Sequence, residues 1–209
     1  AMQSGESKDM LKALKEIIKA CVDTDIKVNT LPIYDIEYIF LQLRARSIGD
    51  KIPITYTLED VKCKKAEDKL CTFETEINID DVNVDKPEGH NPIVELTDTI
   101  KVKMSYPKIE TWAEMSMVMN EKDTVEKTFG IIADSIEYIM DGDEDIHYAK
   151  DYSKKEMGEF MNSLSSPQFQ LIHKFFDTMP KVRKEVTAKC TVCGEENTKV
   201  LEGMADFFA

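Results

Sequence analysis

Four of the five cysteines occur as two pairs that lie far apart in the sequence, and their thiols are the side chains best suited to chemistry. Cys190 and Cys193 form a Cys-x-x-Cys motif followed by Gly194, which is typical of a zinc knuckle because two thiolates at this spacing can bind one ion. The glycine permits the tight turn beneath them. Cys63 and Cys71 are the other candidate ligands, although more residues separate them than the usual two to about four. The sequence therefore predicts a structural Zn²⁺ ion in a split site made by Cys63, Cys71, Cys190 and Cys193.

Two alternatives for these cysteines stay open at the level of sequence. A Cys-x-x-Cys motif also occurs in redox proteins, but no thioredoxin-like βαβ pattern surrounds it here. The four residues are also compatible with unliganded thiols. A catalytic zinc is disfavoured, because four thiolates leave no open coordination position for water. The fifth cysteine, Cys21, lies in a helical pattern and is expected to be a small buried apolar residue.

The paired cysteines lie next to segments with the alternating pattern of half-buried strands. Apolar residues alternate from Ile52 to Leu58 and again from Phe73 to Ile79, so Cys63 and Cys71 are predicted at the tip of a hairpin. A strand from Val182 to Ala188 is predicted to lead into Cys190, and a short final strand from Thr198 to Leu201 is predicted to follow. The metal would then join two hairpins.

Helical spacing dominates the rest of the chain, with one further strand predicted from Ile93 to Met104. The resulting class is α+β, with helices flanking a small antiparallel sheet and a split four-cysteine, zinc-ribbon-like element. Apolar residues recur every three or four positions in the predicted helices, which run from Met10 to Cys21, Leu31 to Gly49, Ile109 to Met119, Val125 to Ile139, Lys154 to Leu164 and Pro167 to Met179.

The order of these elements suggests four parts within one continuous domain. An N-terminal helical part covers residues 1–50, and a β-rich part with the first cysteine pair covers 51–106. A second helical part covers 107–181. The C-terminal strand and knuckle, residues 182–209, are expected to pack on the β-rich part.

The charge balance excludes several classes of partner. Forty acidic residues against 27 basic ones give a formal net charge of −13. This argues against nucleic acid and against an anionic membrane surface, because both are bound through cationic patches. No apolar run approaches the length of about 20 residues that spans a bilayer. An odd number of cysteines without a secretory signal fits a reducing, intracellular compartment.

Other candidate sites carry weaker patterns. The segment Asp141 to Asp145 resembles the start of an EF-hand loop, but Ile146 and Tyr152 stand where that loop needs Gly and Glu, so a solvated acidic turn is predicted. His90, His147 and His173 have no local catalytic partner, and no nucleotide-binding, zinc-protease or nucleophile-elbow motif occurs. The sequence therefore predicts a protein that is not an enzyme.

Two apolar segments are candidate binding surfaces. The methionine-rich stretch from Trp112 to Met119 is compatible with an adaptable surface but is more often core. The tail residues Phe207 and Phe208 are expected to be exposed and available to a partner, because chain ends usually lie at the surface.

Two blocks of the sequence resemble a known family. The first runs from Leu31 to Asp50 and reads LPIYDIEYIFLQLRARSIGD, which is similar to the block LP-x-x-D-x-EY-x-F-x-x-LR-x-x-S-[VI]-G-[ED]. The second runs from Phe175 to Lys181 and continues into the knuckle at Cys190. Both resemble the baseplate hub subunit family of T-even-type tailed bacteriophages, and the similarity covers about Ser7 to Leu201.

The resemblance implies a non-enzymatic phage tail morphogenesis protein that acts through contacts with other baseplate hub or tail proteins. It implies either a central hub subunit of the virion or a hub-assembly factor, with a transient chaperone for a tape-measure or hub protein as the alternative. Assembly would take place in the host cytoplasm. Family members carry a further strand-like segment, rich in basic and aromatic residues, before the first helix, and we expect this segment to be absent from the present sequence. A zinc-containing nucleic-acid-binding module is the less favoured hypothesis, because the charge opposes it.

Overall fold

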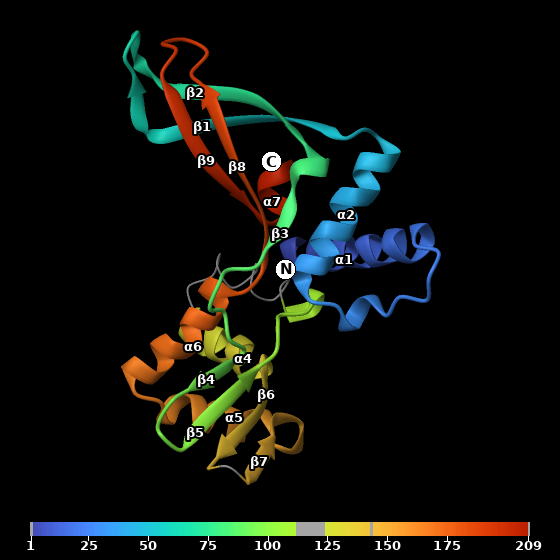
Figure 1. The fold of residues 1–209 in the computed structure, drawn as a ribbon, viewed down its shortest axis with the longest axis vertical. Coiled ribbons are helices and arrows are strands. Elements are labelled where there is room, and N and C mark those ends of the chain that lie inside the picture. Colours follow the sequence, from blue (N-terminus) through green and yellow to red (C-terminus); the bar gives the residue numbers. More distant parts are fainter. Residues whose placement is uncertain (1, 112–123, 143, 209) are drawn as a thin grey trace. The chain divides into compact units, whose positions relative to one another are not determined.

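The structure, a computed structural model, describes residues 2–111, 124–142 and 144–208 (Figure 1). These residues form helices and small antiparallel sheets, which confirms the α+β class. The chain divides into two compact units: unit 1 consists of Ala1–Ile33 and Lys86–Met179, and unit 2 of Tyr34–Asp85 and Pro180–Ala209. Each unit has its own cluster of buried apolar side chains. The division into four sequence parts stays a prediction.

Unit 2 is built from two β-hairpins and the segments that connect them. Its elements are α2 (Ile33–Ser47), β1 (Lys51–Cys63), β2 (Ala66–Asn78), a 3₁₀ turn (Ile79–Asp81), β3 (Asn83–Asp85), β8 (Lys181–Lys189), β9 (Glu196–Glu202) and α7 (Gly203–Phe208). Strand β1 pairs antiparallel with β2, and β8 lies between β3 and β9 in a second antiparallel sheet. An isolated antiparallel bridge between Phe73 and Cys190 links the two hairpins.

The apolar residues that alternate along the predicted strands form the core of unit 2. Ile52, Ile54 and Tyr56 are buried on one face of β1, while the residues between them are exposed. Buried residues of β2, β8 and β9 and Leu41 of α2 complete the cluster. The hairpins thus pack through the residues that the period of two predicts.

The C-terminal tail differs from its prediction. Phe207 is only 1% exposed and packs in the core of unit 2, so the expected exposed aromatic end is wrong for this residue. The chain reverses at Gly203, which has a φ of +70°, and α7 follows directly. This turn brings Phe207 back onto the core, where burial of a large aromatic side chain is favourable.

Replacing Gly203 by alanine is expected to destabilise unit 2 by about 1 to 2 kcal/mol, the usual cost of the left-handed conformation for a residue with a Cβ. The added Cβ would also lie 3.2 Å from the Glu37 Oε1 atom, whose carboxylate is buried. Gly158→Ala is the matched control, because this helical glycine of unit 1 has no atom within 4 Å of an added Cβ. Urea unfolding gives the free energy of unfolding of each variant, and equal values for the two would contradict the account.

Unit 1 contains a four-stranded antiparallel sheet in the order β4-β5-β6-β7. Its elements are α1 (Met2–Cys21), a 3₁₀ turn (Val28–Thr30), β4 (Ile93–Glu95), β5 (Ile100–Met104), α4 (Thr124–Asp134), β6 (Ile136–Asp141), β7 (Asp145–Tyr148), a 3₁₀ turn (Ala149–Asp151), α5 (Lys154–Ser163) and α6 (Ser166–Thr178). Figure 1 shows α4, α5 and α6 on one side of this sheet, and their apolar residues share one core with Val94, Val102, Met104 and Ile136.

The structure confirms the two helices before the C-terminal hairpin. Helix α5 begins with a capping box in which Ser153 and Glu156 satisfy each other's backbone amides, and α6 begins with the same arrangement of Ser165 and Gln168. These caps satisfy amide groups that have no partner within the helix. The helix predicted from Ile109 to Met119 falls largely outside the described residues.

One strand prediction and part of one helix prediction in unit 1 were wrong. The stretch from Ile93 to Met104 is not one strand but a hairpin, because the Thr97 hydroxyl accepts hydrogen bonds from the amides of Thr99 and Ile100 and closes a turn. Ile136 and Ile139 were assigned to a helix and lie in β6 instead. A shift of register between β5 and β6 turns both isoleucines toward the core, which gives them a helix-like spacing of three.

His90 packs inside unit 1 and is expected to make its stability sensitive to acid. Its Nδ1 atom lies 3.0 Å from the Thr178 hydroxyl and its Nε2 atom lies 3.1 Å from the Tyr106 hydroxyl, and the ring also contacts Phe175. Burial lowers the pKa of His90 below its ordinary value of 6.5. The unfolded chain therefore binds the proton more readily, so stability falls as the pH drops from 6.5 toward the folded pKa.

The measurement is urea unfolding at about pH 7.5 and about pH 5.5, on either side of the ordinary histidine pKa. His90→Gln should lose less stability between the two values than the unchanged protein does. His173→Gln is the control, because His173 is exposed on α6 and its removal leaves the contacts of His90 intact. An identical loss in all three proteins would contradict the role of His90.

Among the described residues, no helix combines the length and the apolar character needed to cross a bilayer.

Candidate metal centre

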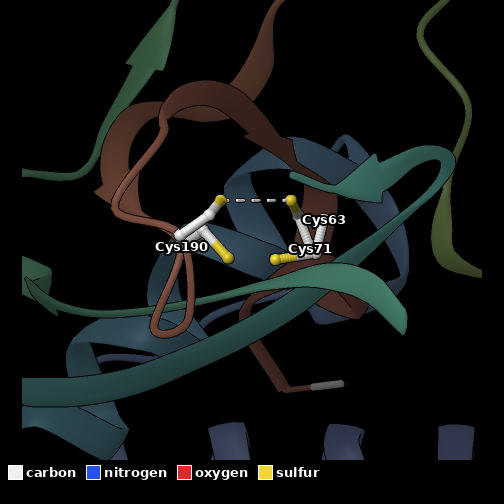
Figure 2. Close-up of side chains that lie close together, drawn as sticks. Cys63, Cys71 and Cys190 are labelled. Atoms are coloured by element: carbon white, nitrogen blue, oxygen red, sulfur yellow. Dashed lines mark hydrogen bonds between the residues drawn. The ribbon is translucent and has the colours of Figure 1, made fainter. Parts of the chain in front are cut away.

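The four paired cysteines come together in unit 2. Their Sγ atoms all lie within 4.8 Å of one another. Figure 2 shows the side chains of Cys63 and Cys71, from the β1–β2 hairpin, turned toward Cys190 at the end of β8. Cys63, Cys71 and Cys190 are buried, and Cys193 is partly exposed. The convergence of the four predicted residues is therefore a property of the fold.

The first hairpin brings Cys63 and Cys71 together through an irregular ladder. Cys63 is the last residue of β1 and pairs with Ala66 across the turn. Farther from the turn, the register shifts between Thr57 and Lys62, so several residues of β1 lie opposite Cys71. A bulge of this kind bends a strand and redirects its side chains. Both thiols are thus buried at the same end of the hairpin.

The second pair lies in a tight turn between β8 and β9. The Cys190 amide donates to the Glu195 carbonyl at 2.7 Å, and the Gly194 amide donates to the Cys190 carbonyl at 3.0 Å. Gly194 has a φ of +80°, a conformation that favours glycine. The turn folds the chain around the Cys190 sulfur, which accepts hydrogen bonds from the amides of Val192 and Cys193.

Backbone and charged contacts hold the two hairpins next to each other around the thiols. Besides the bridge between Phe73 and Cys190, the Thr191 amide donates to the Thr72 carbonyl at 3.1 Å. At the rim, the Lys64 ammonium lies 2.7 Å from a carboxylate oxygen of Glu195. The hydrogen bond with Glu195 raises the pKa of Lys64, and the neighbouring thiols of Cys193 and Cys71 raise it further. A cation is thereby placed beside four groups that become negative on ionisation.

The thiols differ strongly in acidity. The amides of Cys193 and Val192 lower the pKa of Cys190 from 9.0 to about 6. Burial, together with the neighbouring Cys190 and Cys193, raises the pKa of Cys71 from 9.0 to about 12. This is the expected behaviour of closely spaced thiols, since several thiolates cannot ionise side by side unless a cation neutralises them.

The distances and the donor atoms fit a zinc ion. The Sγ atoms of Cys71 and Cys193 lie 3.7 Å apart. A tetrahedral zinc site with Zn–S bonds of about 2.3 Å has sulfur atoms about 3.8 Å apart, so small side-chain rotations would bring the remaining pairs into range. Thiolate ligands also favour zinc, a borderline-soft ion, over hard cations such as Mg²⁺ or Ca²⁺. With four protein ligands such a site is closed, which suits a structural role.

The other residues singled out in the sequence lie elsewhere. Cys21 is exposed at the end of α1, so its predicted burial is wrong. Asp141 and Asp145 pair directly across the β6–β7 turn, which is a hairpin turn rather than a helix-flanked EF-hand loop. His147 contacts Asp145 and Tyr152, whereas His173 contacts Asp177 on its own helix.

Sequence reasoning missed the residues that support the thiols. Phe73 is almost fully buried and pairs with Cys190, and the ion pair of Lys64 and Glu195 closes the rim. The alternation of apolar residues marks Phe73 as a core residue but does not identify its partner in another sheet. Glu195 and Lys64 directly follow Gly194 and Cys63, so their closeness to the thiols in sequence is a signal for a rim position.

Comparison with known proteins adds one match. The sequence model of a protein family described as "T4 bacteriophage base plate protein" matches residues 1–209. No curated protein and no solved structure matches the chain significantly.

Proposed function

Because the chain belongs to the T4 bacteriophage base plate protein family over its whole length, we propose that it is a non-enzymatic protein of the central hub of the base plate. It acts either as a hub subunit that stays in the tail or as a factor that assembles the hub in the host cytoplasm. In both roles it works through contacts with other hub or tail proteins. The family match is the observation that carries this proposal.

We further propose that Cys63, Cys71, Cys190 and Cys193 bind one structural Zn²⁺ ion. The observation that supports this is the convergence of four thiols from two hairpins. The bound ion would cross-link the hairpins and neutralise part of the thiolate charge. Its function is then to fix the shape of unit 2, because four thiolates leave no position at which a substrate could bind the metal.

Ion pairs within unit 2 weaken the nucleic-acid hypothesis, because they engage basic residues of β8. Lys181 of β8 lies 2.7 Å from a carboxylate oxygen of Glu202, and Arg183 lies 3.5 Å from one of Asp85. Side chains engaged in this way have their charge balanced locally. A phosphate backbone would also meet a chain whose formal net charge is −13. We therefore favour protein partners.

Quantitative mass spectrometry of purified phage particles tests the proposal. A hub subunit would be present in mature tails at a fixed number of copies, whereas an assembly factor or transient chaperone would occur only in incomplete base plates from infected cells. The tryptic peptides of an abundant tail protein serve as the internal standard. A protein found in neither fraction during infection would contradict the proposed function.

A further inference from the structure

The sheet of unit 1 has a second face, which α4, α5 and α6 do not cover. The core residues Val94, Val102 and Ile139 point toward the helices, and the residues that alternate with them point to the other side. The strand register aligns these residues in two rows across the sheet, one made by Ile93, Lys103, Tyr138 and Tyr148, the other by Glu95, Lys101, Met140 and Ile146. We call these two rows the open face.

The half of the open face on β6 and β7 is apolar. Ile146 is 43% exposed and Tyr148 is 45% exposed, which is unusual for large apolar side chains in neighbouring positions. They adjoin the half-buried Tyr138 and Met140, and the Tyr138 and Tyr148 rings meet edge-on with centroids 5.8 Å apart. Exposed apolar patches that contain tyrosine and methionine are typical of protein interfaces.

The open face is less acidic than the chain as a whole, because its two rows contain two lysines and one glutamate. Lys101 and Lys103 lie beside the apolar half, and Lys101 forms an ion pair with Glu95 at 3.1 Å. At the other edge, the Lys150 ammonium lies 5.3 Å from the centre of the Tyr148 ring. The formal net charge of the chain is −13, so this lysine-flanked surface stands out from its surroundings.

The end of the open face near Lys103 is concave. A cavity of about 260 Å³ lies there, and its charged lining residues are Lys103, Lys108 and Glu137, beside the apolar Pro32, Pro92 and Tyr106. A depression beside an apolar surface can accept a protruding side chain of a partner, which is where interface energy tends to concentrate.

From these observations we propose that the open face is a docking surface for another base plate protein, which contributes an apolar centre flanked by carboxylates. Carboxylates opposite Lys103 and Lys150 would complement their charge, whereas the two rows of a second copy would offer only Glu95, which is already paired with Lys101. The identity of the partner as a base plate protein rests on the proposed function.

A photo-crosslinking amino acid placed at position 146 or 148 in phage-infected cells tests this surface. Position 171 on α6 is the matched control in unit 1, since Leu171 is 42% exposed but lies on a covering helix. Position 48, where Ile48 is 79% exposed, is the control in unit 2. We expect positions 146 and 148 to crosslink to a carboxylate-rich segment of another base plate protein, and position 171 not to do so.

The remaining outcomes overturn different claims. Crosslinks from positions 146 and 148 to a second copy of this chain would overturn the heterologous partner. Crosslinks to base plate proteins from position 48 or 171, but none from the open face, would overturn the docking surface and leave the proposed function standing. A protein that crosslinks to no base plate protein from any position would contradict both.

Charge reversal then tests whether the lysines of the open face are complementary to the partner. The affinity of each variant is measured by titration with the crosslinked protein. The double variant Lys103→Glu and Lys150→Glu is expected to bind at least about tenfold more weakly, because like charges would face each other at the contact. Lys155→Glu on α5 is the control, since Lys155 is exposed on a helix away from the open face. Equal affinity of both variants, with circular dichroism unchanged, would overturn the charge-based recognition.

Discussion

The double substitution of Cys190 and Cys193 by serine is expected to lower the free energy of unfolding of unit 2 by about 4 kcal/mol or more. This is the stabilisation that a ligand provides at about 1,000 times its Kd, and structural zinc in small domains contributes more. Without the ion, the hairpins keep the bridge between Phe73 and Cys190 and a few further contacts. Hydrogen exchange followed by mass spectrometry should show faster exchange in β1, β2, β8 and β9.

The matched control is Cys21→Ser, because Cys21 is an exposed thiol of unit 1. It should leave both metal content and stability unchanged. If the double variant fails to fold, the unchanged protein treated with a strong chelator provides the same comparison. A chelator-treated protein with the stability and exchange of the untreated one would contradict a structural role for the metal.

Phe73→Ala is expected to destabilise unit 2 by about 3 to 5 kcal/mol, the usual cost of truncating a buried phenylalanine. The Phe73 side chain is 1% exposed, and its ring stacks on Tyr56 with centroids 5.0 Å apart. Its backbone also pairs with Cys190, so the cavity would loosen the strand that positions the thiols. Urea unfolding measures the stability, and competition with a chromogenic chelator measures the accompanying rise in the zinc dissociation rate.

Leu70→Ala controls for the loss of an apolar side chain from the same strand. Leu70 is 40% exposed and is expected to contribute less than about 1 kcal/mol. Equal destabilisation by the two substitutions would show that Phe73 is not a central packing residue, and unchanged zinc release would separate it from the metal site.

Local patterns in the sequence predicted the strands of unit 2 well. The alternation from Ile52 to Tyr56 and the spacing of Val182, Val186 and Ala188 reflect faces that are buried in the structure. Such patterns are reliable because burial on one face of a regular strand repeats every two residues. The helices α5 and α6 were predicted for the same reason, with a period of 3.6.

The errors occur where the ladder is irregular or where distant contacts decide. Ile136 and Ile139 are three residues apart, which matches a helix, yet a register shift places both on the core side of β6. Phe207 was expected at the surface because it lies near the chain end. The turn at Gly203 and the core of unit 2 override that expectation. The periodicity of apolar residues contains no information about a register shift between strands or about a chain end that folds back onto the core.

The convergence of the four cysteines of the candidate metal centre was predictable, but the way in which the fold brings them together was not. Cys190, Cys193 and Gly194 form a recognisable motif, and Cys63 and Cys71 were chosen because each lies next to the end of a predicted strand. The structure adds the reason that these residues meet, which is the bulge opposite Cys71 and the bridge at Phe73. Both depend on pairing between segments far apart in the chain, which local sequence does not encode.

Metal analysis of freshly purified, reduced protein is the most direct test of the structural zinc centre. The account predicts about one zinc per chain, with an X-ray absorption spectrum that reports four sulfur neighbours at about 2.3 Å. A protein without stoichiometric metal, or one whose zinc is bound by nitrogen and oxygen, would contradict it. The four converging thiols would then be core residues, and unit 2 would depend on its apolar packing alone.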